Sequence, residues 1–244
     1  MISVLVSALK IIFLLGFLIG IHETGHFLVA KKCKVRVNEF SIGFGPTIWK
    51  KQGEETLYAL RLIPLGGYVS MEGESEHSDK EGSFTKASIS KRIAIVVAGA
   101  GVNIIFAIIV YFILATIHFE SFYNGIVSTG KFLLAILDSI GQLFVGKVST
   151  DQLMGPVGIS EIISKTSGLE EFIYMLALIS ISLGVTNLMP FPPLDGGKIL
   201  FLIIEAIRRK PIKEETEIQI QLLGFALLIA LSIYVTYHDI IRIL

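Results

Sequence analysis

Four long apolar segments divide this chain, and they predict membrane-spanning helices. They cover residues 2–30, 93–117, 172–189 and 218–237. A helix of roughly 20 residues crosses the hydrocarbon of a bilayer, so these lengths fit. The first segment lacks the basic start and the small-residue cleavage pattern of a secretory signal peptide, so we interpret it as a span. We therefore expect an α-helical polytopic membrane protein with four transmembrane helices, folded as one domain over residues 1–244.

The chain between the first two spans follows a different pattern. β-Branched and aromatic residues partly alternate with other residues over 35–42, 56–63 and 68–71, and glycines and prolines separate these runs. This pattern predicts a membrane-associated β-hairpin or sheet insertion at about residues 35–72, after the first helix. Residues 126–148 are apolar only in part and predict a short extracytoplasmic amphipathic helix at the membrane surface.

Basic residues are unevenly distributed among the loops. The loop after the first span has eleven lysines and arginines, the next has three, and the last has five. Because these residues accumulate on the cytoplasmic side, the first and third loops should be cytoplasmic. Both termini should then lie outside the cytoplasm.

Composition supports a membrane protein and limits the kinds of binding site that the chain could form. Apolar residues make up 52% of the chain and charged residues 17%, and the mean hydropathy is +0.71. The 21 basic and 21 acidic residues cancel, so no basic field favours nucleic acid. Cys33 is the single cysteine, which excludes an internal disulfide and a multi-cysteine zinc ribbon. A bound metal would need histidine and carboxylate ligands.

The first span contains the string His22-Glu23-Thr24-Gly25-His26. Residues four apart lie on one face of a helix, so both imidazoles can reach one metal ion, and Glu23 can reach a metal-bound water. Ionisable groups at membrane depth are costly and are functional candidates by default. The alternative is that the two histidines only form hydrogen bonds across a helix bundle.

A catalytic zinc takes three protein ligands, so a third ligand is needed. Asp195 follows the third span, which runs inward like the first, and it should lie on the same side at a comparable depth. His118 and His238 follow spans that run outward, and His77 lies in a polar stretch that we expect to be solvated. Topology therefore favours Asp195 as the third ligand.

The local sequence also suits Asp195 to this position. Three prolines at 190, 192 and 193 break the helix, and we expect Gly196 and Gly197 to let the backbone bend and turn the carboxylate toward the metal. The alternative is that Asp195 only caps a helix over residues 196–209. The His-Glu-x-x-His string in the first span makes us favour the ligand.

The two separated motifs, His22-Glu23-x-x-His26 and Leu194-Asp195-Gly196 after Asn187-x-x-Pro190, resemble those of the site-2 protease family of intramembrane zinc metalloproteases. The resemblance covers most of the chain and is strongest to the bacterial branch that acts in regulated intramembrane proteolysis. It also rests on five further stretches, at residues 40–46, 64–69, 99–103, 155–159 and 182–187.

The resemblance implies one Zn²⁺ held by His22, His26 and Asp195, with Glu23 as general base and then acid. It implies that Asn103 and Asn187 are polar, substrate-binding groups near the site, and that a membrane-dipping β element at Gly67, Tyr68 and Val69 pairs with an unwound substrate. Thr24 departs from the usual leucine at a position that should not touch the metal. The family branch usually carries PDZ domains between the second and third spans, and the 54 residues of 118–171 are too few for one.

The function we expect is zinc-dependent hydrolysis of peptide bonds within or next to transmembrane segments of other membrane proteins. By resemblance, the substrates include anti-sigma factors or signal-peptide remnants, and the location is a bacterial inner membrane. An alternative is a non-catalytic metal-binding scaffold, although Glu23 would then be unnecessary. A metal transporter is disfavoured because the other spans lack repeated carboxylates or histidines.

Overall fold

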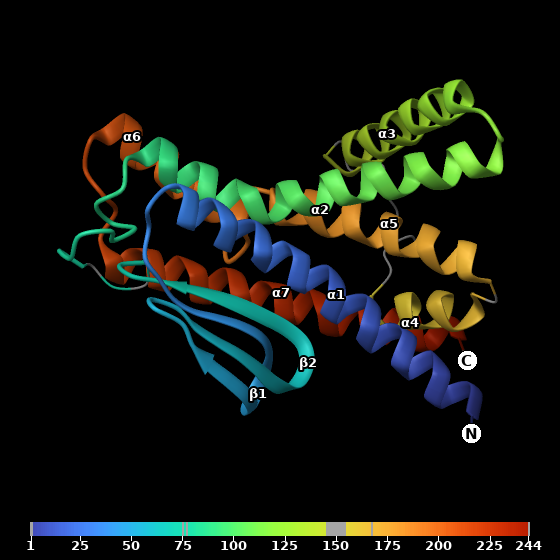
Figure 1. The fold of residues 1–244 in the computed structure, drawn as a ribbon, viewed down its shortest axis with the longest axis horizontal. Helices are drawn as coiled ribbons and strands as arrows, with labels where there is room; N and C mark the ends of the chain where they lie inside the picture. The colour runs from blue at the N-terminus through green and yellow to red at the C-terminus, as the bar shows by residue number, and fades with distance from the viewer. Residues whose placement is uncertain (1, 75, 77, 145–154, 167, 244) are drawn as a thin grey trace. The chain divides into compact units, whose positions relative to one another are not determined.

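The computed structural model describes residues 2–74, 76, 78–144, 155–166 and 168–243. Four of its helices are long and apolar enough to span a membrane, which confirms the expected polytopic membrane protein (Figure 1). They are α1 (Ile2–Lys32), α2 (Ile89–His118), α5 (Leu169–Asn187) and α7 (Glu214–Ile243). The other elements are β1 (Val37–Gln52), β2 (Leu57–Met71), α3 (Phe122–Phe144), α4 (Pro156–Lys165) and α6 (Asp195–Arg208).

The long helices extend beyond the apolar segments that predicted them. α1 continues through Lys31 and Lys32, and α7 begins with Glu214, Glu215 and Glu217 in its first turn. Basic residues at a helix C-terminus and acidic residues at an N-terminus stabilise the helix dipole. The charged residues therefore extend α1 at its C-terminus and α7 at its N-terminus beyond the apolar segments.

The β insertion after α1 is confirmed, but it consists of two long bent strands rather than three short runs. Residues 39–42 of β1 pair with residues 67–70 of β2 on one side and with residues 57–60 on the other. The bend in β1 falls at Gly43 and Gly45, whose φ angles of +88° and +80° suit glycine but few other residues. In the described part of the chain, residues 67–71 have a strand on one side only.

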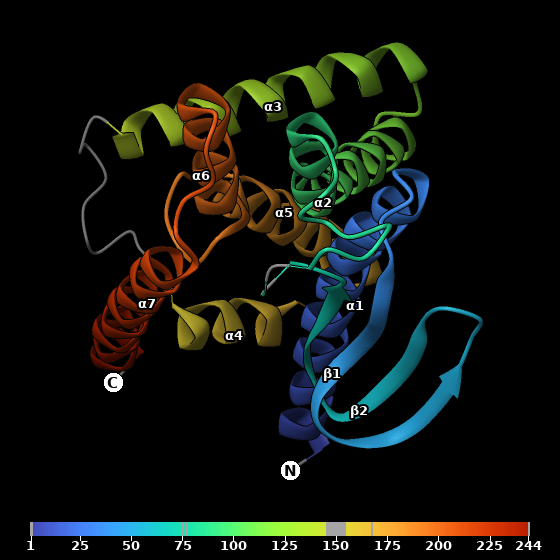
Figure 2. The ribbon, with the colours of Figure 1, turned by 90° about the vertical axis from the view of Figure 1, so that its left-hand side faces the viewer.

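The chain separates into two compact units. The larger unit contains residues 11–104 and 180–225, and therefore both strands, α6 and parts of the long helices. Within it the sheet lies beside α1 (Figure 2). The ring of Phe27 on α1 lies 5.2 Å from that of Phe40 and 6.0 Å from that of Tyr58. Its core is apolar and includes Val35, Val37, Met71, Phe84, Ile95 and Leu202.

The smaller unit contains residues up to Lys10, residues 105–179 and residues from Ala226 onward. In it α3 runs back beside the end of α2 (Figure 1). The Tyr111 ring of α2 stacks on the Phe132 ring of α3 with centroids 4.1 Å apart. The predicted amphipathic segment at 126–148 falls on α3 up to Phe144, and its last four residues lie outside the described residues.

A buried carboxylate fixes the start of α4 in the smaller unit. Asp239 of α7 is 1% exposed, and its Oδ2 accepts hydrogen bonds from the backbone N–H groups of Gly155 at 2.9 Å and Gly158 at 2.7 Å. Arg242 approaches the other oxygen at 3.2 Å. The carboxylate thus satisfies free N–H groups at a helix N-terminus, where the helix dipole favours negative charge.

Candidate metal centre

His22, His26 and Asp195 lie together in the larger unit, and each offers one ligand atom. His22 Nε2 and His26 Nε2 are 3.2 Å apart, and Asp195 Oδ2 lies 3.2 Å from the first and 3.5 Å from the second. Ligands at about 2.0–2.1 Å from a tetrahedral zinc are separated by roughly 3.3 Å. The triangle therefore has the size that a zinc ion requires. No other described residues form such a group.

Asp195 supplies a second test of this fit. Its Oδ2 atom is buried and has no hydrogen-bond donor assigned to it, which is costly for a carboxylate oxygen. Burial works against the charged form, but the facing His22 and His26 rings outweigh it and hold the pKa of Asp195 at about 2. An anionic oxygen that faces two ring nitrogens is a suitable donor set for Zn²⁺.

The His26 ring is oriented by the backbone of α2. Its Nδ1 lies 2.8 Å from the carbonyl oxygen of Ile95, which can only accept a hydrogen bond. Nδ1 therefore donates this hydrogen bond, which leaves Nε2, on the side of His22 and Asp195, as the ring atom that can bind a metal. A hydrogen bond of this kind fixes the tautomer of a metal-binding histidine.

The His22 ring is oriented in a similar way, by the side chain of Asn103 on α2. Asn103 is fully buried, and its amide lies 3.5 Å from His22 Nδ1 through Nδ2, while its Oδ1 has no partner. The two ends of an amide have nearly the same shape, so a half-turn places Oδ1 where it accepts a proton from His22 Nδ1. This side chain contacts the ring of a candidate ligand, although the sequence suggested a substrate contact.

The two helices that carry this arrangement approach closely because of glycines. A Cβ at Gly25 would lie 2.5 Å from the carbonyl oxygen of Ala98. A Cβ at Gly99 would lie 2.3 Å from His26 Nε2 and 2.9 Å from His22 Nε2. Any side chain at Gly99 would therefore occupy the space beside the ligand atoms.

α6 positions Asp195 at its first residue. Leu194, not Asp195, is the N-cap residue of α6, and its side chain makes no capping hydrogen bond. The alternative in which Asp195 only caps a helix is therefore not what the structure has. We expected Gly196 and Gly197 to let the backbone bend through the conformational freedom of glycine. This expectation is wrong, because neither residue has a positive φ. Glycine is needed at 196 for space, since a Cβ there would lie 2.1 Å from the carbonyl oxygen of Met189.

Glu23 and the strand edge lie side by side. A Cβ at Gly67 would lie 3.3 Å from Cγ of Glu23, so the backbone of β2 passes directly beside this carboxyl side chain. Tyr68 follows, and its hydroxyl accepts a hydrogen bond from Arg61 at 2.8 Å. Val69 packs against the apolar core. Asn187 is the last residue of α5 and is half-buried.

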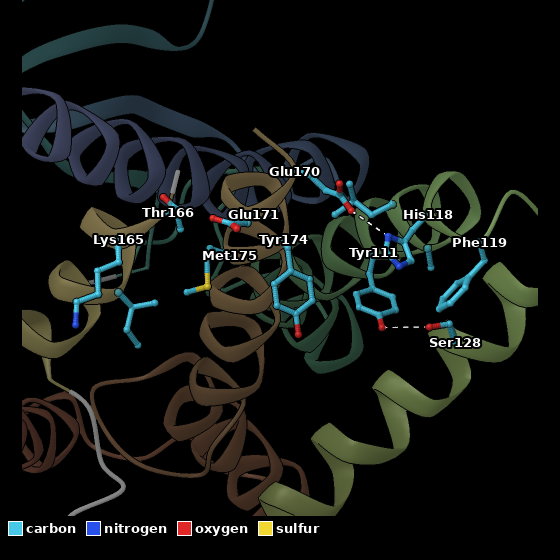
Figure 3. A pocket seen from close by; sticks show the side chains of 13 residues that line it. Tyr111, His118, Phe119, Ser128, Lys165, Thr166, Glu170, Glu171, Tyr174 and Met175 are labelled. Atoms are coloured by element: carbon cyan, nitrogen blue, oxygen red, sulfur yellow. Dashed lines mark hydrogen bonds and ion pairs between the residues drawn. The ribbon is translucent and has the colours of Figure 1, made fainter. Parts of the chain in front are cut away.

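The remaining histidines lie elsewhere. His118 belongs to the smaller unit, where its Nδ1 lies 3.4 Å from Glu170 on the wall of a cavity of about 560 Å³ (Figure 3). His238 packs on the rings of Tyr234 and Tyr237. His77 lies outside the described residues.

Sequence reasoning missed two contributors from α2, the Ile95 carbonyl and Gly99. A signal was present, because Ile95, Gly99 and Asn103 are spaced four apart. Residues at this spacing share one helix face, and this face packs against the histidines of α1. The spacing indicates a common face, but only the structure shows which partner that face has.

Comparison with known proteins gives a consistent result. Residues 10–231 match the model described as "Peptidase family M50". The zinc metalloprotease RasP of Shouchella clausii is 47% identical over 111 residues, which cover 45% of this chain and 27% of that protein. RasP of Geobacillus kaustophilus is 23% identical over an alignment that covers 98% of this chain and 99% of that protein. RasP of Oceanobacillus iheyensis is 24% identical over an alignment that covers 97% of this chain and 99% of that protein. The alignment with the Geobacillus protein has 418 positions, so that protein carries well over a hundred residues without a counterpart in this 244-residue chain.

Proposed function

The chain belongs to peptidase family M50, and on that premise we propose that it is a zinc endopeptidase that cleaves peptide bonds within or next to transmembrane segments of other membrane proteins. The observation that carries the proposal is the triangle of His22, His26 and Asp195, which has zinc-like dimensions and lies beside Glu23. The site lies on helices of an integral membrane protein, which supports substrates in the bilayer.

His22 Nε2, His26 Nε2 and Asp195 Oδ2 are the proposed ligands. When held by these three atoms, Zn²⁺ would supply Lewis-acid activation of the scissile carbonyl and of the attacking water. Ile95 and Asn103 act as positioning groups, since they hold the two imidazole rings rather than contact the substrate. Gly99 keeps the space beside the ligand atoms open.

Glu23 is the proposed general base. It lies next to His22 in sequence and beside the backbone of Gly67, and its carboxyl group interacts electrostatically with His22, His26 and Asp195. From there the carboxylate can take a proton from the attacking water and then deliver it to the nitrogen of the leaving amine. A structural metal site would need no such group, which argues against the scaffold alternative.

Residues 67–71 are the proposed docking edge for the substrate. They pair with β1 on one side, and no described strand covers the other. A peptide added to this edge is held in an extended form, and an extended form exposes the carbonyl that a helix keeps hydrogen-bonded. Tyr68, Val69 and the half-buried Asn187 are proposed to contact the substrate from this side.

The proposed orientation follows the distribution of basic residues. It places both termini outside the cytoplasm and puts the ligand cluster toward the cytoplasmic side. Cysteine labelling in sealed vesicles tests it, with cysteines introduced singly in a Cys33→Ala background. Position 54, in the turn between β1 and β2, should react only from the cytoplasmic face.

The test of the function is cleavage of a model transmembrane substrate by the purified protein. Chelation should abolish cleavage, and one equivalent of Zn²⁺ per chain should restore it. A protein that binds the substrate and zinc without cleaving would support the scaffold instead. Failure to cleave any substrate with zinc bound would overturn the proposal.

A further inference from the structure

Four polar side chains form a cluster on the β sheet that the proposed chemistry does not use. Arg61 lies at its centre, and its Nη2 donates to Glu39 Oε1 at 2.7 Å and to the Tyr68 hydroxyl at 2.8 Å. Its Nε donates to Ser41 Oγ at 2.9 Å, and its Nη1 donates to the carbonyl oxygen of Gly45 at 3.0 Å. All three guanidinium nitrogens are therefore used. We call Glu39, Ser41, Arg61 and Tyr68 the Arg61 cluster.

The Arg61 cluster connects three neighbouring segments of the sheet. Residues 57–60 and residues 67–70 pair with opposite sides of residues 39–42, so one segment separates them. Arg61 directly follows residues 57–60, yet its guanidinium reaches across the middle segment to Tyr68 in the docking edge. The side chain of Arg61 therefore ties the docking edge to a segment with which its backbone does not pair.

The cluster lies on the face of the sheet that points away from α1. Side chains along a strand alternate between the two faces. Phe40 packs on the Phe27 ring of α1, and Val69 packs against the apolar core. Their sequence neighbours Ser41 and Tyr68 therefore point to the opposite face. The cluster can act on the position of the docking edge, but it does not contact the candidate metal ligands.

Glu39 keeps the guanidinium in place. Partial burial raises the pKa of Glu39, but hydrogen bonds from the Tyr68 hydroxyl and from Arg61 outweigh it and hold this pKa below its usual value. The carboxylate therefore stays charged at neutral pH and forms charge-assisted hydrogen bonds, which are stronger than neutral ones. The guanidinium carbon also lies 5.5 Å from the centre of the Tyr68 ring. Both the ring and the hydroxyl of Tyr68 are thus held by Arg61.

Tyr68 is well placed to fix the docking edge beside the proposed general base. The edge begins at Gly67, where a Cβ would lie 2.8 Å from the carbonyl oxygen of Ser41 and 3.3 Å from Cγ of Glu23. This close approach leaves no room for an anchoring side chain at residue 67. Tyr68 is the next residue, so its contacts with Arg61 help to set where the edge backbone passes Glu23.

From these observations we infer that Arg61 is a positioning residue for substrate binding, which acts through Tyr68 to hold the docking edge beside Glu23. A strand edge that is already held in its binding conformation loses less freedom when a peptide pairs with it, so the peptide binds more tightly. The inference rests on the proposed function, because it takes the substrate as the peptide that pairs with this edge.

The test measures the Kd of a model transmembrane substrate for protein that carries Glu23→Gln, so that no turnover interferes. Arg61→Lys in this background keeps the positive charge but loses the planar fork that serves several acceptors at once. We expect the Kd to rise about three- to tenfold, the effect of losing one or two partly exposed hydrogen bonds. With Glu23 intact, Arg61→Lys should raise KM by a similar factor and leave kcat within about twofold of wild type.

Tyr68→Phe tests whether Arg61 acts through Tyr68, because it removes only the hydroxyl that Arg61 binds. The Kd of the Arg61→Lys, Tyr68→Phe double variant should be no higher than that of Arg61→Lys alone, since both changes break the same contact. Hydrogen exchange supplies a measurement that needs no substrate. Backbone amides of residues 67–71 should exchange faster in Arg61→Lys, while amides of α1 and the zinc content stay as in wild type.

Arg36→Lys is the matched control, because Arg36 is exposed directly before β1. It should leave the Kd and the exchange of residues 67–71 unchanged. An unchanged Kd in Arg61→Lys, an equal rise in Arg36→Lys or fully additive losses in the double variant would overturn the inference. Loss of zinc or faster exchange in α1 would overturn it too, since Arg61 would then act on general stability. Absence of cleavage by wild-type protein would count against the proposed function alone, because the comparison of Kd values requires no cleavage.

Discussion

Gly99→Ala is the smallest change that should damage the metal centre without removing a ligand. The added Cβ would lie 2.3 Å from His26 Nε2 and 2.9 Å from His22 Nε2. Non-bonded carbon and nitrogen atoms pack at roughly 3.5 Å, so the His26 ring would have to move by about 1 Å. The ring cannot move freely, because it is buried and its Nδ1 is bound to the Ile95 carbonyl.

A shift of this size is large for a metal ligand. Zinc–ligand distances in real sites stay within about 0.2 Å of their usual values. Changes to groups that only support a ligand already cost roughly 10- to 100-fold in metal affinity, and we expect Gly99→Ala to cost at least this much. The substitution should not harm the helix itself, since alanine is favoured over glycine by about 1 kcal/mol in a helix interior.

The assay is a competitive zinc titration of purified Gly99→Ala, with Gly101→Ala as the matched control. Gly101 lies on the same helix, and a Cβ there would meet nothing within 4 Å. The control should bind zinc as wild type does. Equal zinc affinity in all three proteins would refute the argument that the α1–α2 contact leaves no room beside the ligands.

Three further outcomes are expected. Asp195→Ala should lose zinc, whereas His118→Ala and His238→Ala should retain it, as metal analysis of the purified proteins will show; zinc retained in Asp195→Ala would place the third ligand elsewhere. Asp239→Ala should lower the free energy of unfolding by about 3 kcal/mol, because it leaves buried N–H groups at the start of α4 without an acceptor. Denaturant unfolding in detergent measures this, with the exposed Asp138→Ala as control. Helix-breaking residues near the cleavage position of a substrate should speed cleavage, and equal rates for helical and broken substrates would argue against docking in an extended form.

Much of the fold could be predicted because the bilayer imposes simple rules. Apolar length alone identified the four spans, and the β pattern identified the insertion after α1. The strands were predicted too short, since Gly43 and Gly45 looked like breaks between strands. They are bends within one strand, and a glycine-rich sequence does not distinguish a bend from an end.

The candidate site was predictable where the chemistry has a local signature. The histidines of α1 share a helix face, and topology selected Asp195 from a distant segment. Contacts between helices were not predictable, because no local rule tells which face of α2 meets α1. The role of Asn103 was therefore assigned to substrate, although its amide lies against His22.

The most direct test of the central claim is zinc content and cleavage measured side by side for wild type and Glu23→Gln. Glutamine has nearly the same shape as glutamate but cannot accept the proton of the attacking water. The account predicts one zinc per chain in both proteins and a loss of cleavage of at least about 100-fold in Glu23→Gln, within the range of general-base contributions. Cleavage by Glu23→Gln at more than about one hundredth of the wild-type rate would contradict the role of Glu23.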